Sequence, residues 1–203
     1  MVKLYPGLLT ISGNLMVSVD LETTGVRAGY HDIIQIAIMP LDSSFRPLDG
    51  VRPFYTTVAP RKPERAEPMA LIKNHLDLTD LVMNAPSSDR VVDLLIEWFE
   101  KLELPFGKRL VPMAHNWAFE QSFLSSWLGP AMMDDLFHFH ARDSMLYAIG
   151  LNDKAESMGE AIPFARVSLG SLCNKLGIIN TNPHDALADC MAGAELYREL
   201  LKR

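Results

Sequence analysis

The sequence predicts an α/β protein in which a mixed β-sheet is flanked by helices on both faces. The first third of the chain holds strand-like apolar runs separated by turn-forming residues, and the remainder alternates amphipathic helical patterns with short apolar runs. That order is expected of one sheet covered on both sides. A chain of 203 residues is also the size of one domain and can bury a substantial core.

The strand patterns come first. One apolar run ends at the turn Thr23-Thr24-Gly25, and two later runs are bounded by turn-forming Asp, Ser and Gly. A charged, proline-rich stretch follows them. The elements expected here are strands over 15–22, 32–40 and 51–58, a loop over 59–68 and a short helix over 71–76.

Helical patterns dominate after residue 87. The clearest has Val91, Leu95 and Trp98 at helical spacing behind the cap candidates Ser87 and Ser88. The elements expected after it are a strand over 109–114, a helix over 117–128 stopped by Gly129-Pro130, a strand over 137–141, and helices over 144–157, 168–176 and 186–202.

The charge balance limits the kind of nucleic-acid contact. The formal net charge is −6. Proteins that coat a duplex depend on many Lys and Arg contacts to phosphates, so extended non-specific binding is excluded. An enzyme that holds a few nucleotides at one end is compatible with this charge.

Compartment and domain boundaries follow from simple features. Cys173 and Cys190 fall in helix-like segments and suggest no disulfide framework, which favours a reduced, cytoplasmic setting. Pro6 and Gly7 interrupt the first apolar stretch, so no signal peptide is expected, and no apolar run is long enough to span a membrane. We expect residues 1–14 to be a short N-terminal extension of a domain over 15–203.

Two carboxylates on the first strand indicate a metal site. Side chains alternate along a strand, so Asp20 and Glu22 point the same way, with Leu21 opposite. Adjacent carboxylates repel each other unless a cation or a shared proton neutralises them. Oxygen ligands suit hard ions such as Mg²⁺ or Mn²⁺.

Two later segments complete a pattern with this pair. They are His115-Asn-Trp-Ala-Phe-Glu120 and His184-Asp-Ala-Leu-Ala-Asp189. In this order and at these distances, the three segments resemble the DEDDh family of 3′→5′ exonucleases over about residues 15–201. The resemblance implies an RNase H-like fold for nearly the whole chain.

The family resemblance also implies roles. Asp20, Glu22, Glu120 and Asp189 would hold two Mg²⁺ or Mn²⁺ ions, and His184 would be the general base that deprotonates the attacking water. His184 and Asp189 are five residues apart, about 140° around an ideal helix, so both cannot face one site from mid-helix. Pro183 therefore favours a loop or first-turn position for His184.

Glu120 departs from the family pattern, which usually has aspartate there. The charge is kept, but the side chain is one methylene longer. We expect Glu120 to serve the second metal ion, directly or through water.

Six neighbouring residues are candidates for substrate binding. On the resemblance, the turn after the acidic pair contacts the 3′-terminal nucleotide; an ordinary strand-ending turn is the alternative. For Asn116, helix capping is equally favoured. Trp117 either stacks on a nucleotide or belongs to the core. The candidates are Thr23, Thr24, Gly25, His115, Asn116 and Trp117.

Two clusters outside these motifs are better explained without function. Arg61, Lys62 and Arg65 either approach a phosphate backbone or form a solvated loop, and the loop is favoured. His138 and His140 share one face of the expected strand over 137–141, but no third metal ligand is evident.

The resemblance implies a metal-dependent enzyme that hydrolyses nucleotides one at a time from a 3′ end and releases nucleoside 5′-monophosphates. The form Asp20-Leu-Glu-Thr-Thr-Gly25 favours single-stranded DNA, with short RNA next. The alternative is a catalytically weakened fold that binds nucleic acid or associates with a polymerase, although no docking tail is evident. Family relatives include homodimers.

Overall fold

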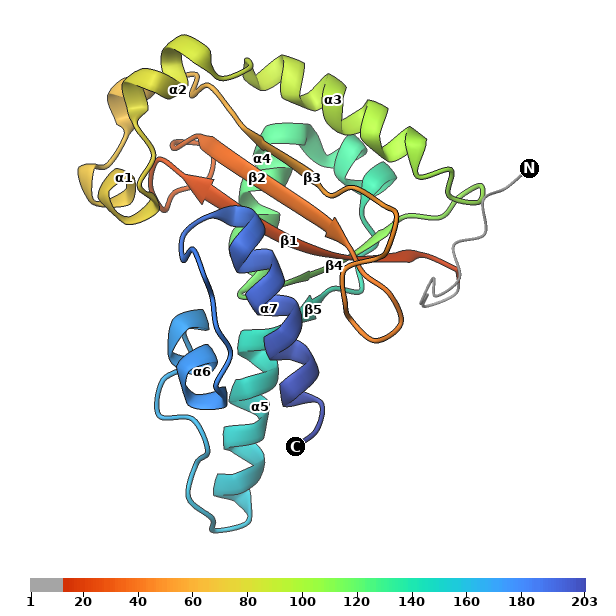
Figure 1. Ribbon diagram of the computed structural model, residues 1–203, viewed down its shortest axis with the longest axis vertical. Helices are drawn as coiled ribbons and strands as arrows, with labels where there is room; N and C mark the ends of the chain where they lie inside the picture. The colour runs from red at the N-terminus through yellow and green to blue at the C-terminus, as the bar shows by residue number, and fades with distance from the viewer. Residues whose placement is uncertain (1–12) are drawn as a thin grey trace.

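The computed structural model describes residues 13–203 and is built around one five-stranded mixed sheet, with strand order β3-β2-β1-β4-β5 (Figure 1). The central strand β1 is antiparallel to β2 and parallel to β4. The strands are β1 (Leu15–Thr23), β2 (Ile33–Pro40), β3 (Phe54–Thr57), β4 (Leu110–Ala114) and β5 (Arg142–Asp143).

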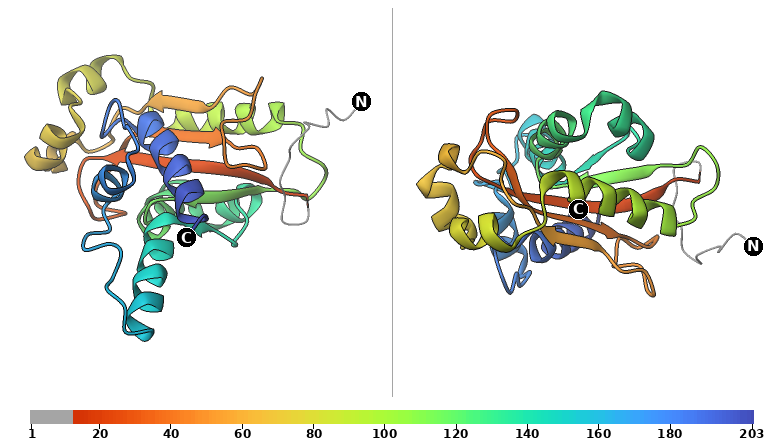
Figure 2. Two further views of the ribbon diagram at one scale, coloured as in Figure 1. Left: turned by 60° about the horizontal axis from the view of Figure 1, so that its bottom comes forward. Right: turned by 90° about the horizontal axis from the view of Figure 1, so that it is seen from above.

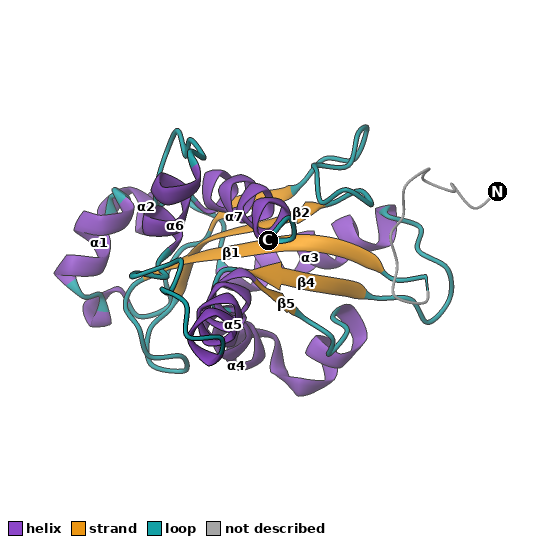
Figure 3. Ribbon diagram, turned by 90° about the horizontal axis from the view of Figure 1, so that it is seen from below, coloured by secondary structure: helices purple, strands orange, loops and turns teal. Residues whose placement is uncertain are grey.

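Helices cover both faces of this sheet, which confirms the predicted fold class. Figures 2 and 3 show α7 on one face, with α3 and α4 on the other. The helices are α1 (Pro68–Asn74), α2 (Leu78–Asn84), α3 (Ser88–Lys101), α4 (Trp117–Leu136), α5 (Ser144–Ser157), α6 (Leu169–Leu176) and α7 (Ala186–Leu200), with a 3₁₀ turn over Pro63–Arg65.

The alternation of β1 explains the two layers of core. Val17, Val19 and Leu21 are buried in a cluster with residues of α3 and α4. Met16 packs in a second cluster with residues of α7, and the Ser18 hydroxyl donates to the Cys190 carbonyl at 3.0 Å. Asp20 and Glu22 continue the series of Met16 and Ser18, so they point to the side of the sheet covered by α7.

A third buried cluster holds the C-terminal helices together. It joins Ala148 of α5, Leu172 of α6 and Leu196 of α7. In Figure 1 the pair α5 and α6 extends below the sheet, away from α1 and α2 at the top left. This packing ties the second half of α7 to α5 and α6, whereas Ala186 at the start of α7 packs against the sheet.

Three sequence-based expectations for the elements were wrong. The expected strand over 137–141 is absent: only Phe137 forms a bridge, to Leu110, and the strand is β5 at 142–143. The helix α4 resumes after a kink at Gly129 (φ 77°, ψ 162°), because Pro130 is a favourable first residue for the next helical turn. The short helix α2 was not expected; Asp77 caps it by accepting from the Thr79 and Asp80 backbone N–H groups.

The predicted extension over residues 1–14 falls almost entirely outside the described residues, and the boundary at residue 15 stays a prediction. Between residues 13 and 203, no helix combines the length and apolar character needed to cross a membrane.

Candidate active site

A cleft of about 770 Å³ opens where β1 ends, between α1, the start of α4 and the loop before α7. Four of the five predicted catalytic residues line it, although they come from opposite ends of the chain: Asp20, Glu22, His184 and Asp189. The sheet therefore supplies two carboxylates, and the α7 region supplies a histidine and a third carboxylate.

The two β1 carboxylates lie in an environment that disfavours their charge. Burial raises the pKa of Asp20 well above its usual range, and repulsion from Glu120, Asp189 and Glu22 raises it further. Burial and the Asp189 charge raise the pKa of Glu22 to about 8, against an opposing contribution from Lys73. A cation that binds in such a site lowers its free energy, because the positive charge neutralises the repelling carboxylates.

His184 lies in the loop before α7, as the sequence predicted. Its backbone is left-handed (φ 67°), and its N–H donates to the Asp189 carboxylate at 3.3 Å. Asn180 donates to the other Asp189 oxygen at 2.5 Å. One ligand atom each from Glu22, His184 and Asp189 lie within 4.8 Å of one another. The left-handed turn thus lets two residues that could not share a helix face meet in one site.

Glu120 lies behind Asp20, in the first turn of α4. It is only 4% exposed, and within residues 13–203 its Oε2 atom has no hydrogen-bond partner. Burial raises its pKa to about 8, with further repulsion from Asp143 and Glu22. An orphaned buried carboxylate oxygen is uncommon in folded proteins and points to a partner such as a cation.

These residues fit divalent metal ions. The donor set consists of the carboxylates of Asp20, Glu22, Glu120 and Asp189, and oxygen donors of this kind are preferred by Mg²⁺ and Mn²⁺. Within the described chain the cluster has Lys73 as a cationic neighbour at the cleft, which is too little charge to neutralise four carboxylates.

The turn after the acidic pair is held internally. Thr24 is fully buried: its hydroxyl accepts from the Asp32 N–H at 2.9 Å, so its side chain does not reach the cleft. Thr23 lines the cleft, but its hydroxyl donates to the Gly25 carbonyl at 2.7 Å. A Cβ on Gly25 would come within 2.5 Å of the His31 ring, so only glycine fits there. Thr23 and Gly25 present backbone to the cleft, and Thr24 serves the turn.

The second motif divides between the cleft and the core. His115 and Asn116 line the cleft, and His115 Nδ1 lies 2.9 Å from the Ser144 hydroxyl. Trp117 is 8% exposed and packs against Phe137 at 6.0 Å between ring centroids, so the core alternative holds and it does not reach the cleft.

Asn116 occupies the N-cap position of α4, but its side chain makes no capping hydrogen bond. The Asp143 carboxylate accepts instead from the Asn116 and Trp117 N–H groups, at 3.2 and 2.8 Å. The capping alternative for Asn116 is therefore wrong, and its side chain is left facing the cleft.

Comparison with protein families decides what kind of cleft this is. The family model described as Exonuclease, RNase_T, matches residues 17–197. The chain belongs to this exonuclease family. Membership confirms both the resemblance drawn from the three acidic motifs and the predicted enzyme class, a nuclease of the hydrolase type. No curated protein matches the chain.

Solved structures agree on the fold of this exonuclease-family chain. Exonuclease I of E. coli in complex with a dT13 oligonucleotide aligns with a TM-score of 0.70 at 16% identity, over 94% of this chain and 41% of that one. Exonuclease I of Methylocaldum szegediense aligns with a TM-score of 0.69 at 18% identity, over 94% and 41%. A 3′-exonuclease that recognises the histone mRNA stem-loop aligns with a TM-score of 0.65 at 16% identity, over 93% and 64%. The chain spans about two fifths of the exonuclease I chains.

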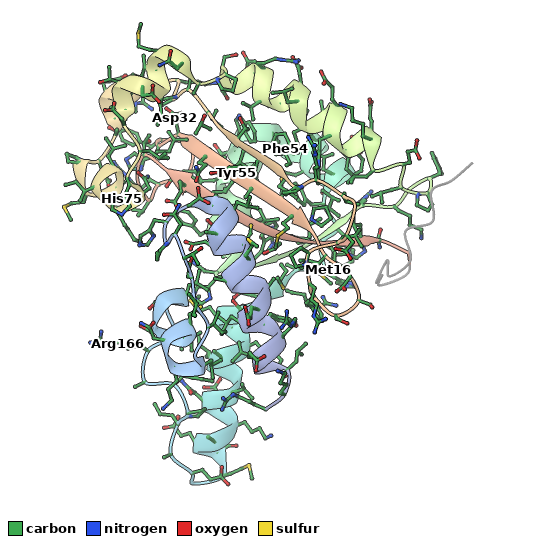
Figure 4. All side chains as sticks on the ribbon, in the orientation of Figure 1. Met16, Asp32, Phe54, Tyr55, His75 and Arg166 are labelled. Carbon is green, nitrogen blue, oxygen red and sulfur yellow. The ribbon has the colours of Figure 1, made fainter. Side chains whose placement is uncertain are left out.

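A polar network behind the exonuclease cleft was not foreseen from the sequence. The Tyr55 hydroxyl donates to Asp185 Oδ2 at 2.5 Å, and Gln35 Oε1 accepts a hydrogen bond from the Ala186 N–H at 2.8 Å. Asp185 Oδ1 caps α7 by accepting from the Ala188 N–H at 3.0 Å. Figure 4 shows Tyr55 close to the beginning of α7. The network fixes the residue next to His184 to the edge of the sheet.

The cleft walls also contain residues that sequence reasoning missed. They lie on α1, α4 and α5 and on the start of α6, and are mainly apolar with one cation: Met69, Lys73, Phe119, Met145 and Leu169. Exposed apolar positions on α1 were the available signal, since Met69 is 72% exposed on a helix of only seven residues.

Proposed function

We propose that this chain is a 3′→5′ exonuclease that hydrolyses single-stranded DNA, and short RNA less well, to nucleoside 5′-monophosphates with two divalent metal ions. The observation that carries the proposal is the meeting of three carboxylates and one histidine in a single cleft of an exonuclease-family fold, with a fourth carboxylate, Glu120, buried behind them. The dT13 complex of the similar exonuclease I supports DNA as the first substrate to test.

The carboxylates give the site its negative charge and bind the cations. Asp20, Glu22 and Asp189 face the cleft, and Glu120 adds its unpartnered oxygen from behind. When bound, the metal ions supply positive charge that activates water and stabilises the leaving 3′-oxygen. Mg²⁺ and Mn²⁺ both suit the four carboxylates.

His184 receives the proton of the attacking water. Burial and the neighbouring cations Lys73 and His75 lower its pKa, so the imidazole is neutral at pH 7 and can act as a base. Its backbone N–H holds Asp189 at the same time, which couples the position of the base to that of a metal ligand.

The cleft walls position the terminal nucleotide. Phe119, Met145 and Leu169 provide apolar surface for the base and sugar, and Thr23 and Gly25 line the same space. Holding the reacting phosphate between the walls and the carboxylates accounts for much of the catalysis expected of such a site, because phosphoryl transfer depends mainly on positioning and charge neutralisation.

The test is degradation of 5′-labelled single-stranded DNA and RNA oligomers of one sequence with Mg²⁺ or Mn²⁺. The controls are EDTA and the isosteric variant Asp20→Asn. A descending ladder that both controls abolish supports a metal-dependent 3′→5′ exonuclease, and the faster oligomer identifies the preferred sugar. Labelling the 3′ end instead must release a single labelled nucleotide in the first step.

No cleavage of either oligomer with either metal would contradict the proposal. Retained binding of the same oligomers would then favour the weakened, binding-only form of the fold. Cleavage that survives EDTA would contradict the role of the carboxylates.

A further inference from the structure

A second charged site lies beside the cleft, on the other side of the segment that joins β1 to β2. It is a pocket of about 240 Å³ between that segment, the 3₁₀ turn before α1, the start of α3 and the middle of α4. We call it the basic pocket. Its lining includes Tyr30, Asp32, Arg61, Lys62 and Arg65.

Cations are concentrated here although the chain as a whole is acidic. The guanidinium carbon of Arg65 lies 4.5 Å from the centre of the Tyr30 ring, and that of Arg27 lies 4.4 Å from it. Arg61 pairs with Asp89 across the protein surface. Against a net charge of −6, four cations within one small region form a distinct positive patch.

The positive charge of the pocket is only partly compensated. Asp32 lines the pocket, and its carboxylate accepts from the Lys62 backbone N–H at 2.8 Å. Within residues 13–203, the ion pairs of the structure include neither Arg27, Lys62 nor Arg65. Two guanidinium groups held near one ring repel each other, and an anion bound to these cations would offset that repulsion.

The fold holds the pocket in a fixed relation to the cleft. His31 is 5% exposed; its Nδ1 accepts from the Arg27 N–H at 2.9 Å, and its Nε2 lies 3.3 Å from Glu67, which lines the cleft. The Glu67 N–H donates to the Thr24 carbonyl at 2.7 Å. His31 is a buried connection between the two sites.

We propose that the basic pocket binds a backbone phosphate of the nucleic-acid strand whose 3′ end occupies the cleft, several nucleotides from that end. The proposal rests on the proposed function for the identity of the strand. Guanidinium groups suit phosphate because their fixed donors match its oxygens, and the aromatic ring holds them ready. The loop Arg61 to Arg65 is thus a binding element as well as a solvated one.

Salt-dependent binding tests the pocket without requiring turnover. The probe is 5′-fluorescein dT15, and every variant is made in the Asp20→Asn background so that no cleavage occurs. The double variant Lys62→Gln/Arg65→Gln should lower the slope of log K against log salt concentration by about 0.7, since the pocket binds one phosphate and each phosphate contact to a single strand contributes about 0.7. The variant Lys154→Gln, with an exposed lysine on the distant helix α5, should leave the slope unchanged.

The ring provides a second test that does not change charge. Tyr30→Ala should weaken dT15 binding several-fold because both guanidinium groups lose their support, whereas Tyr30→Phe should bind like the parent. Equal binding by Tyr30→Ala and Tyr30→Phe, together with an unchanged slope for the double variant, would overturn the proposal. An equally large decrease of the salt slope in Lys154→Gln would also overturn the proposal, because the effect would then come from the net charge of the protein and not from a site.

Kinetics with the intact Asp20 separate this proposal from the function of the cleft. On dT15 the double variant should raise KM with little change in kcat. On the p-nitrophenyl ester of thymidine 5′-monophosphate, which fills only the cleft, neither constant should change. An inactive wild type would count against the proposed function alone, because dT15 binding would still report on the pocket. An active wild type with a double variant of unchanged KM would count against the pocket alone.

Discussion

The cleft and the basic pocket lie on two sides of the same β1–β2 segment, yet they treat charge in opposite ways. In the cleft, Asp20 is partly buried and Glu120 is buried, and desolvation is the largest cause of their raised pKa values. In the pocket, Arg61 is half exposed and remains solvated. Like charges are costly where water is excluded and nearly free where it is not.

This difference predicts how the two regions respond to substitution. The cleft lowers the stability of the metal-free protein in exchange for a site that binds cations, as expected of functional sites that trade stability for activity. The pocket should affect substrate affinity and leave folding unaffected. Each experiment below tests one side of that contrast.

Asp20→Asn should have the largest effect, in opposite directions on activity and stability. Loss of a metal ligand should reduce turnover by at least about 10³-fold, roughly 4 kcal/mol of transition-state stabilisation. In EDTA at pH 8.5, the midpoint of thermal unfolding should rise by about 2–4 °C, corresponding to about 1 kcal/mol in a chain of this size. Activity assays and thermal unfolding measure the two effects.

Asp153→Asn is the matched control, because Asp153 is exposed on α5 and its removal relieves no buried repulsion. A fall in the unfolding midpoint of Asp20→Asn would contradict the view that the cleft carboxylates strain the metal-free fold.

Glu120 variants should have the next largest effect. Glu120→Gln keeps the shape but removes the charge at the orphaned oxygen, and should lower kcat by about 10²-fold, as for residues that support a metal site. Glu120→Asp, the residue usual in the family, should keep kcat within about tenfold. Single-turnover assays across a Mg²⁺ titration separate weaker metal binding from slower chemistry. Equal activity of Glu120→Gln and wild type would remove Glu120 from the site.

The cleft could be predicted further from sequence than the pocket. Asp20 and Glu22 share a face by strand alternation alone, and the position of His184 follows from its spacing to Asp189 and from Pro183. These are local rules, so they needed no knowledge of the fold. The order of strand and helix patterns predicted the mixed sheet, and the family resemblance then connected the segments.

What the sequence could not show depends on contacts between distant segments. Trp117 and Asn116 are neighbours, but only the packing of α4 against Phe137 and Asp143 decides that one faces the core and the other the cleft. The Tyr55–Asp185 hydrogen bond joins residues 130 positions apart. The charged loop at residues 59–68 was visible as a run of basic residues, but its organisation depends on Tyr30 from another loop.

The pH dependence of stability should separate the metal-free and metal-bound protein. The folded-state pKa values of Glu22 and Glu120, about 8, lie above the ordinary 4.5, so the folded protein holds protons that the unfolded chain has released. Stability should therefore fall as pH rises between about 4.5 and 8. Below about pH 6.5, histidines with lowered pKa values such as His184 oppose this trend, so pH 6.5–8.5 is the informative window.

In EDTA, the unfolding midpoint should fall by at least about 3 °C across that window, given about 1.36 kcal/mol per pH unit for one group. Excess Mg²⁺ should flatten or reverse the slope, because the ions bind the deprotonated carboxylates. A midpoint that rises with pH in EDTA would contradict the raised pKa values.

Tyr55→Phe should have the smallest effect, because Tyr55 combines the solvent exposure of the basic pocket with a hydrogen bond to the cleft. Tyr55 is 43% exposed, as solvated as the basic pocket, but its hydroxyl binds Asp185 beside His184. The variant loses the hydrogen bond to Asp185 and the one that Tyr55 accepts from Gln35 Nε2 at 3.1 Å, and a net loss of about 0.5–1.5 kcal/mol corresponds to a two- to tenfold fall in kcat if they position His184. KM for dT15 and the unfolding midpoint should stay nearly unchanged, since Asp185 still caps α7 through its other oxygen.

Tyr30→Phe is the control, because the ring of Tyr30, not its hydroxyl, holds the guanidinium groups. If Tyr55→Phe and Tyr30→Phe have equal kcat, the hydrogen bond from Tyr55 to Asp185 does not position His184. Burial alone would then determine which residues affect turnover in the cleft.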